Sequence, residues 1–298
     1  MGSEDFYAEE RPVHEARVGG FWMDHHPVTV REFRRFVKAT GHVTVAETSP
    51  AAEDFPDADP EQLVPGSLVF SPPPIPVSLD DFRAWWAWTP SAQWRHPEGP
   101  GSTLHGLELH PVTHVAYADA VAYAEWAGKE LPTEAEWECA ARGGIESATY
   151  AWGDEFAPRG RMMANTWQGD FPMHNELLDG YARTSPVGTF PPNGYGLVDM
   201  TGNVWEWTSQ HYASSHATET SERVTATSAG TSCCGPQRDT ATSASSQHAT
   251  GEPSAKVVKG GSHLCAPNYC LRYRPAARQR QTVDTSTSHL GFRCIVRP

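Results

Sequence analysis

Residues 145–212 constrain the fold most, because this long stretch carries no sustained helical or strand period. Trp, Gly, Pro and Asn dominate it, and these residues are typical of turns and ordered loops. Backbone carbonyls in loops lack the partners that a helix or a sheet supplies, so such loops often need bound ions to order them. The stretch therefore predicts short strands joined by ordered loops.

Three short segments outside this stretch carry helix signals. The first covers residues 28–38, where Thr29 and Glu32 have the spacing of a capping box. The second covers residues 117–127 and is followed by a glycine. The third, residues 133–142, opens with another capping box and ends at two glycines. These elements predict one α+β domain, spanning residues 1–298 and rich in irregular structure.

Two stretches of biased composition predict loops. Residues 47–80 are rich in Pro, Asp and Ala and predict a long surface loop. Residues 213–255 are rich in Ser, Thr and Ala and predict a flexible insert, in which Cys233 and Cys234 are expected to be unrelated thiols. After the insert, residues 291–296 predict a closing strand.

Aromatic residues suggest where part of the core lies. Four tryptophans follow the first predicted loop, and we expect most of them to pack in the core: Trp85, Trp86, Trp88 and Trp94.

The charge balance excludes several classes of partner. The chain has a net charge of −13, which argues against binding to nucleic acid or to an anionic membrane surface. No apolar run approaches the roughly 18 residues of a membrane span, and the acidic N-terminus has no signal-peptide pattern. His105, His110 and His114 lack a carboxylate at the next useful offset, so structural histidines are favoured over an iron site.

Residues 260–274 contain the strongest signal for chemistry. Cys265 and Cys270 follow a Gly-Gly pair and precede four arginines, at positions 272, 274, 278 and 280. A thiol with an ordinary pKa of about 8.5 is mostly protonated at neutral pH, and nearby cations favour the thiolate. Two thiolates form a soft ligand set, suited to Cu(I) or Zn. The spacing alone also allows a structural disulfide or two buried thiols.

The blocks around this cysteine pair resemble those of the formylglycine-generating enzymes, the sulfatase-modifying factor family. The matching blocks are "WRHPEGP", "WAGKELPTEAEWE", "PPNGYGL", "GNVWEWT", "KGGSHLCAPNYCLRYRPAAR" and "HLGFRC". The resemblance implies the α+β formylglycine-generating-enzyme fold, related to C-type lectins. It also implies oxidation of one cysteine in a client sulfatase to Cα-formylglycine. The client would be an unfolded or nascent polypeptide carrying Cys-x-Pro-x-Arg, and the reaction would use O2 and an external thiol or other reductant.

The resemblance also implies roles for individual residues. Cys265 and Cys270 would hold Cu(I), Ser262 would lie beside an oxygen pocket, and Trp205 and Tyr269 would line it. Two structural Ca²⁺ sites are implied. The first would use the side chains of Asn165 and Asp179 and the backbone of Thr166 and Tyr181. The second would use the side chains of Asp199 and Glu206 and the backbone of Gly202 and Val204. On composition alone, each calcium cluster would be a solvated loop.

Three departures from the family pattern are visible. The positions of two eukaryotic disulfides are held by Ala124 with Cys294 and by Ala141 with Pro275, so neither bridge can form, which favours a reducing, cytoplasmic location. His289 replaces the family's Asn before "LGFR". The chain begins at the final Met-Gly-Ser of a first-strand motif, so that strand is expected to be missing.

Three alternative functions remain at this level. An ergothioneine-synthase-like iron sulfoxide synthase would need an additional helical domain with a His-rich iron motif, and the sequence shows neither. A lectin-like binding module would have no need of Cys265 and Cys270. A thiol-based oxidase would use the same two cysteines as a disulfide, and copper stoichiometry would distinguish it from the copper enzyme.

Overall fold

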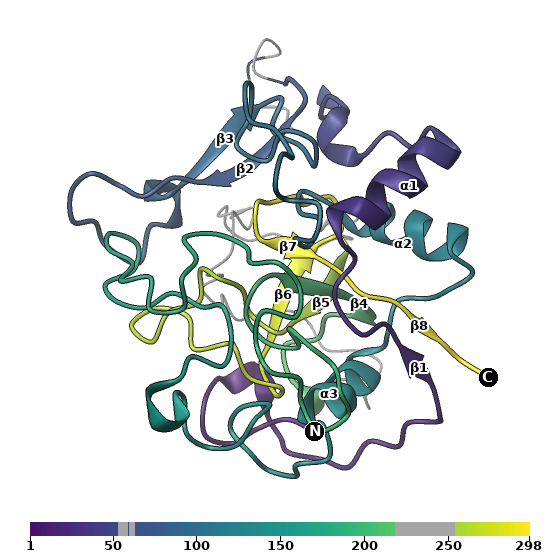
Figure 1. Cartoon of the computed structure of the whole chain (residues 1–298), viewed down its shortest axis with the longest axis vertical. Coiled ribbons are helices and arrows are strands. Elements are labelled where there is room, and N and C mark those ends of the chain that lie inside the picture. Colours follow the sequence, from purple (N-terminus) through teal and green to yellow (C-terminus); the bar gives the residue numbers. More distant parts are fainter. Residues whose placement is uncertain (53–58, 60–62, 218–253) are drawn as a thin grey trace, which may run out of the picture.

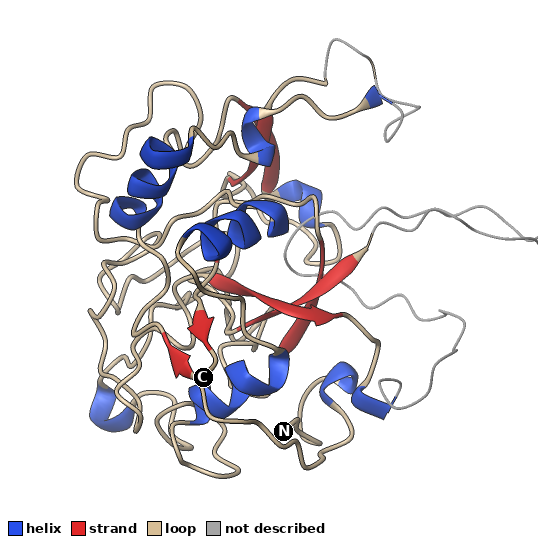
Figure 2. Ribbon diagram, turned by 90° about the vertical axis from the view of Figure 1, so that its right-hand side faces the viewer, coloured by secondary structure: helices blue, strands red, loops and turns tan. Residues whose placement is uncertain are grey.

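The computed structural model describes residues 1–52, 59, 63–217 and 254–298 (Figure 1). Most of the predicted insert, with Cys233 and Cys234, lies outside these residues. Loops make up much of the described chain, and the helices lie around a small central group of strands (Figure 2). The expected ordered loops of residues 145–212 are confirmed: this stretch contains only one short 3-10 helix and, at its end, one strand.

A four-stranded sheet lies at the centre, with the order β6-β5-β4-β7. β4 (Trp205–His211), β5 (Ala255–Lys259) and β6 (Arg278–Thr282) are antiparallel neighbours, whereas β7 (Leu290–Gly291) runs parallel to β4. β1 (Trp22–Met23) pairs with β8 (Ile295–Val296), so a segment from the N-terminal part of the chain pairs with the C-terminal segment in one small sheet. β2 (Gly66–Phe70) pairs with β3 (Trp86–Pro90) in a third sheet.

The three predicted helices are confirmed, with ends displaced by at most two residues. α1 covers Val30–Thr40, α2 covers Tyr117–Trp126 and α3 covers Glu134–Arg142. Both predicted capping boxes form, and Gly41 ends α1 in the left-handed conformation at φ 72°. Single 3-10 turns lie at Ala8–Glu10, Val45–Glu47, Phe82–Ala84 and Pro158–Gly160. Among the described residues, no helix is long and apolar enough to cross a bilayer.

Two sequence predictions are wrong. Residues 47–80 are not one surface loop, because β2 lies within them and pairs with β3 along its whole length. The proline-rich flanks obscured this short apolar run, whose residues are mostly buried. Residues 291–296 are not one strand either. Gly291 ends β7, and the chain then leaves that sheet before Ile295 begins β8 in another.

Aromatic residues fill two adjoining clusters of the core. The larger cluster joins α1 and α2 to the central sheet through residues such as Phe33, Tyr123 and Phe292, and it also contains the cysteine pair. The second cluster packs Trp85 and other aromatic side chains under β2 and β3. The core role expected for most of the four tryptophans is confirmed, since three are buried and only Trp88 is 45% exposed.

A buried group of charges joins α3 to the central sheet. The Lys259 side chain is fully buried, with Nζ 3.4 Å from a Glu134 oxygen and 3.2 Å from a Glu138 oxygen. Arg278 lies 2.8 Å from the other Glu134 oxygen, and Arg142 lies 2.8 Å from Glu138. Each carboxylate therefore faces two cations, which offset the cost of removing it from water.

This charge cluster predicts a specific loss of stability in acid. Burial would raise the pKa of Glu138, but Lys259 and Arg142 outweigh it and lower the pKa from 4.5 to about 2. A carboxyl with a depressed folded-state pKa contributes stability above its unfolded pKa and loses it as the pH falls towards the folded value. Between pH 4.5 and 2 we expect this group to lose about 3 kcal/mol of unfolding free energy.

Chemical denaturation across this pH range measures the effect. Glu138→Gln should be less stable than the parent at pH 7, and the difference should disappear near pH 2. Glu130→Gln is the control, because the Glu130 side chain is 60% exposed. If the unfolding free energy of Glu138→Gln fell with pH as that of the parent does, other groups would be responsible for the loss of stability in acid.

Candidate active site

The two cysteines lie on the loop that leaves β5. Gly260 and Gly261 begin this loop with φ angles of 93° and 68°. A side chain on Gly261 would lie 2.9 Å from the backbone of Arg272, so the start of the loop packs directly on the residues that end it. Between them, the Cys265 N–H donates to the Ser262 carbonyl and the Cys270 N–H to the Ala266 carbonyl. These two turns bring both cysteines to one point.

The two sulfur atoms face each other inside the protein. The Cys265 and Cys270 Sγ atoms are 2.9 Å apart, and each residue is 1% exposed. No disulfide joins the two residues, since their separation is longer than the roughly 2.05 Å of a disulfide bond. The Ser262 N–H lies 3.4 Å from the Cys265 sulfur. Two converging sulfur donors, shielded from water, suit a soft monovalent ion such as Cu(I).

Of the three other residues expected at this site, Ser262 contacts Cys265, and the other two belong to or pack against the core cluster that holds the pair. Ser262 is fully buried, and its hydroxyl accepts the Leu264 N–H. Trp205 lies in the same core cluster as the two cysteines, and Tyr269 packs against that cluster. The Tyr269 ring stacks on Phe171, with ring centres 4.8 Å apart. The roles of Ser262, Trp205 and Tyr269 in an oxygen pocket stay a prediction.

Sequence reasoning missed the partners of the arginines that follow the pair. The Leu271 N–H, directly after Cys270, donates to the Tyr7 hydroxyl at 2.9 Å. Arg272 forms an ion pair with Glu9 at 2.6 Å. Arg274 likewise forms a buried, bidentate ion pair with Glu10, with N–O distances of 2.9 and 2.5 Å.

These contacts correct the expected role of the arginines. Glu9 and Glu10 neutralise the charges of Arg272 and Arg274, and Arg278 is paired within the cluster under α3. Paired in this way, these three cations hold the chain around the site rather than simply adding positive charge beside the thiols. The signal in the sequence is the acidic pair Glu9-Glu10 in an otherwise irregular N-terminal segment.

The histidines expected to be structural have hydrogen-bond partners or lie outside the core. His114 is buried between the Ser67 hydroxyl and the Pro97 carbonyl, and burial lowers its pKa to about 4. His110 contacts the Thr184 hydroxyl, and His105 is exposed. In the residues that the structure describes, His, Cys, Asp and Glu side chains do not form a metal-binding group of three or more.

His289, the departure from the family pattern, is also buried. Its Nδ1 lies 2.7 Å from the Thr287 hydroxyl, and its ring lies against Trp86 with centres 4.8 Å apart. Burial, reinforced by His263 and His114, lowers the pKa of His289 well below its ordinary value. A neutral imidazole is therefore expected here at physiological pH.

The first set of expected calcium ligands comes together in the structure. Asp179 accepts the N–H groups of Thr166 and Tyr181 at 3.0 and 2.9 Å, which folds the two loop segments onto each other. The Asn165 amide nitrogen donates to the Arg183 carbonyl, and its buried Oδ1 has no hydrogen-bond partner among the described residues. The Gln168 amide nitrogen donates to Asp179 at 2.8 Å and to the Thr166 carbonyl. The unpaired, buried Asn165 oxygen fits a hard cation such as Ca²⁺.

The second expected set is already occupied by a protein cation. Both Glu206 oxygens accept hydrogen bonds from Arg293, at 2.7 and 2.8 Å, and Trp137 donates to one of them at 2.7 Å. Arg293 also donates to the Asp199 carbonyl at 3.0 Å. Burial raises the pKa of Asp199. Because a guanidinium lies between the two acidic residues, this set fits Ca²⁺ less well than the first.

Calcium is accordingly expected to stabilise the fold mainly through the first set. A ligand that binds only the native state adds about 2.7 kcal/mol at a hundred times its Kd. Chelation should lower the melting temperature of the parent. Asp179→Asn should remove most of that response, and Glu206→Gln should change it less.

Asp170→Asn is the matched control, because Asp170 is an exposed carboxylate in the same loop region. Calorimetric melting curves with and without chelator measure the response. An identical chelator response in Asp179→Asn and in the parent would refute the first site.

Comparison with known proteins places this site in a family. The model of the sulfatase-modifying factor enzyme 1-like domain matches residues 1–298. A formylglycine-generating enzyme of Mycobacterium tuberculosis is 52% identical over 299 residues, which cover 100% of this chain and 94% of that protein. The bovine formylglycine-generating enzyme is 40% identical over 302 residues, covering 99% of this chain and 71% of that protein.

Solved structures support the same class of fold. PvdO from Pseudomonas aeruginosa superposes with a TM-score of 0.59 at 21% identity, covering 99% of this chain and 89% of that one. Treponema denticola variable protein 1 superposes with a TM-score of 0.54 at 18% identity, covering 100% and 91%. The fold is the expected α+β fold of the formylglycine-generating enzymes, related to C-type lectins.

The chain belongs to the sulfatase-modifying factor family. The family also contains a bovine relative named inactive Cα-formylglycine-generating enzyme 2, which is 37% identical over 288 residues and covers 96% of this chain and 80% of that protein. Membership alone therefore does not establish activity, and a reaction has to be inferred from the residues of the site.

Proposed function

We propose that this protein is a copper-dependent oxidase that converts one cysteine of a client sulfatase to Cα-formylglycine. The observation that carries the proposal is the pair of buried thiols that face each other at 2.9 Å in the Cys265–Cys270 loop. Relatives named formylglycine-generating enzymes, which align with the whole chain or nearly all of it, support the substrate class. The client would be an unfolded or nascent sulfatase carrying Cys-x-Pro-x-Arg.

The stoichiometry of this reaction explains why a reductant is expected. Conversion of the cysteine thiol carbon to an aldehyde, with release of hydrogen sulfide, oxidises that carbon by two electrons. O2 accepts four electrons when both of its atoms are reduced to water, and hydrolysis of the resulting thioaldehyde supplies the aldehyde oxygen and releases the hydrogen sulfide. An external thiol or other reductant would supply the remaining two electrons and two protons.

Different residues of the chain would bind the metal, position a ligand and exclude water. Cys265 and Cys270 would hold Cu(I) through their sulfur atoms, and the bound ion would supply activation of O2 beside the substrate thiol. The Ser262 N–H would hold the Cys265 sulfur in place. Half-buried Tyr269, backed by Phe171 and Trp85, would shield the pair from water.

Tyr273 would contribute an uncharged side chain to the lining of the site. Burial above all, and then Tyr150 and the two thiols, raise the pKa of Tyr273 above its ordinary value. Its hydroxyl therefore stays protonated through the neutral range. The calcium ions, bound mainly by Asn165 and Asp179, would order the neighbouring loop without taking part in the reaction.

Mass spectrometry of a peptide substrate tests the proposal. The copper-loaded protein, O2 and a thiol reductant should convert the cysteine of a Cys-x-Pro-x-Arg peptide to an aldehyde that reacts with a hydrazide. The same peptide with Ser in place of Cys, and a reaction without O2, are the controls. Absence of aldehyde from a demonstrably copper-loaded sample would reject the proposal.

A second candidate function rests on the same observation. Two thiols that face each other could instead cycle through a disulfide and oxidise client thiols without metal. This oxidase would yield disulfides and no aldehyde, and its rate would not depend on copper. Copper stoichiometry and the nature of the product therefore separate the two candidates.

A further inference from the structure

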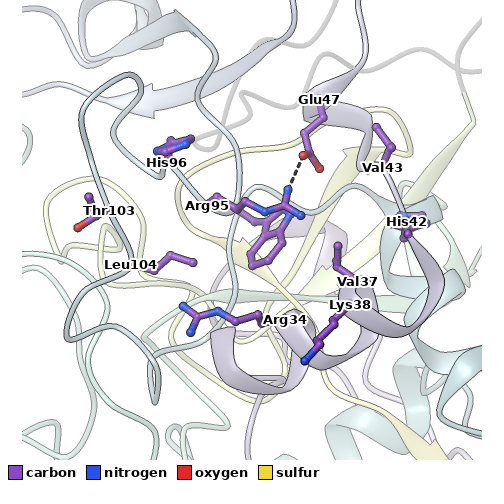
Figure 3. Close-up of a pocket in the computed structure, with 12 residues that line it drawn as sticks. Arg34, Val37, Lys38, His42, Val43, Glu47, Arg95, His96, Thr103 and Leu104 are labelled. Atoms are coloured by element: carbon purple, nitrogen blue, oxygen red, sulfur yellow. Dashed lines mark hydrogen bonds and ion pairs between the residues drawn. The ribbon is translucent and has the colours of Figure 1, made fainter.

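A cavity of about 540 Å³ opens between α1, the turn that follows it and the loop around residues 94–104 (Figure 3). Its volume lies in the range of small-molecule sites, roughly 300–1,000 Å³. Val37, Trp94 and Leu104 contribute apolar surface to it. Trp94 is 2% exposed and belongs to the main core, so this wall is rigid.

Three cations lie around this apolar surface. Arg34 and Lys38 are exposed and four residues apart on α1, so they project from the same side of the helix. Like charges at this spacing repel each other. Neither has an ion-pair partner in the described part of the chain. A bound anion would relieve the repulsion.

The third cation is fixed in place. The Arg95 guanidinium lies 4.2 Å from the centre of the Trp94 ring and 2.6 Å from a Glu47 oxygen (Figure 3). Glu47 is the only carboxylate in the described lining, and Arg95 already pairs with it. The lining therefore keeps the positive charges of Arg34 and Lys38 uncompensated, in a chain whose net charge is −13.

We propose that this cavity binds a small organic anion, independently of the cysteine chemistry. Its apolar body would pack on Leu104 and on the small part of Val37 and Trp94 that lines the cavity. Its carboxylate, sulfonate or phosphate group would lie between Arg34 and Lys38, with Arg95 at the edge. An anionic group on an apolar body satisfies both parts of the lining, whereas a neutral hydrocarbon leaves the two cations unpaired.

Calorimetric titration with 2-naphthalenesulfonate at low ionic strength tests this site. Arg34→Gln/Lys38→Gln should weaken binding about tenfold, as expected for the loss of two partly exposed charge contacts. Arg31→Gln/Arg35→Gln is the matched control. It removes two charges at the same spacing from the same helix, but from residues outside the cavity. The control should bind within about twofold of the parent.

Two further probes distinguish the contribution of the cations to binding from that of the apolar residues. Neutral 2-naphthalenemethanol and inorganic sulfate should each bind more weakly than the sulfonate. Equal binding of the neutral probe would show that the cations contribute nothing, and equal binding of sulfate would show that the apolar wall contributes nothing. Either result would overturn the proposal, as would an equal loss of affinity in both double variants.

Discussion

Cys265→Ser and Cys270→Ser should each lower conversion of a Cys-x-Pro-x-Arg peptide by about a thousandfold or more, the scale seen when a reacting group is removed. A serine hydroxyl is a hard and poorly ionised donor, so it cannot replace a thiolate on Cu(I). The loss should appear in turnover and also in copper affinity, measured by competition with a coloured Cu(I) chelator. The two buried sulfur atoms act as one ligand set, so the double variant should be no worse than either single one.

Two other cysteines provide matched controls. Cys139 is partly exposed on α3, and Cys294 is a fully buried core residue whose pKa is raised by burial, which makes it an inert thiol. Cys139→Ser and Cys294→Ala should keep tight copper binding and turnover near the parent value. Unfolding curves of all four variants establish that the comparison is made on folded protein. Full turnover in Cys265→Ser would refute the proposal that this cysteine pair holds the copper ion.

Arg293→Met should produce the largest loss of stability, about 3–5 kcal/mol of unfolding free energy. Arg293 and Glu206 are 0% and 1% exposed, and the guanidinium contacts both carboxylate oxygens. Without Arg293, the Glu206 carboxylate keeps one side-chain partner among the described residues, the Trp137 N–H, and its buried charge is uncompensated. Denaturant unfolding in the presence of chelator measures the effect, so that no added cation replaces the guanidinium.

Arg297→Met is the control for this prediction. Arg297 also pairs with a carboxylate, at 2.7 Å from Glu136, but its side chain is 34% exposed. Solvent screens such a pair, so its loss should cost at most about 1 kcal/mol. The double variant Arg293→Met/Glu206→Gln should recover part of the stability, because the unpaired charge is gone. Equal losses in Arg293→Met and Arg297→Met would contradict the view that burial sets the cost.

The features that could be predicted from the sequence are local ones. A capping box joins residues three positions apart, so Thr29 with Glu32 could be recognised without knowledge of the fold. The cysteine pair is equally local: Cys265 and Cys270 lie on one loop, and two short turns bring their sulfur atoms together. The resemblance then supplied the family, which the comparisons confirm.

The features that could not be predicted depend on partners distant in the chain. β2 is a short strand between proline-rich segments, and it was obscured because its partner, β3, lies beyond a further loop. Glu206 has the oxygen atoms of a calcium ligand, but only the fold shows that Arg293 pairs with it. The arginines after Cys270 likewise gave no sign that residues 9 and 10 would neutralise them.

The N-terminal contacts of the site also affect how this protein folds during its synthesis. The Tyr7 hydroxyl and the Leu271 N–H are separated by 264 positions, and β1 pairs with β8 near the other end of the chain. Such contacts carry a high contact order, and they form only after nearly the whole polypeptide has left the ribosome. The thiols at positions 265 and 270 are thus enclosed late. Until these contacts form, the two thiols lie outside the folded protein and are open to oxidation.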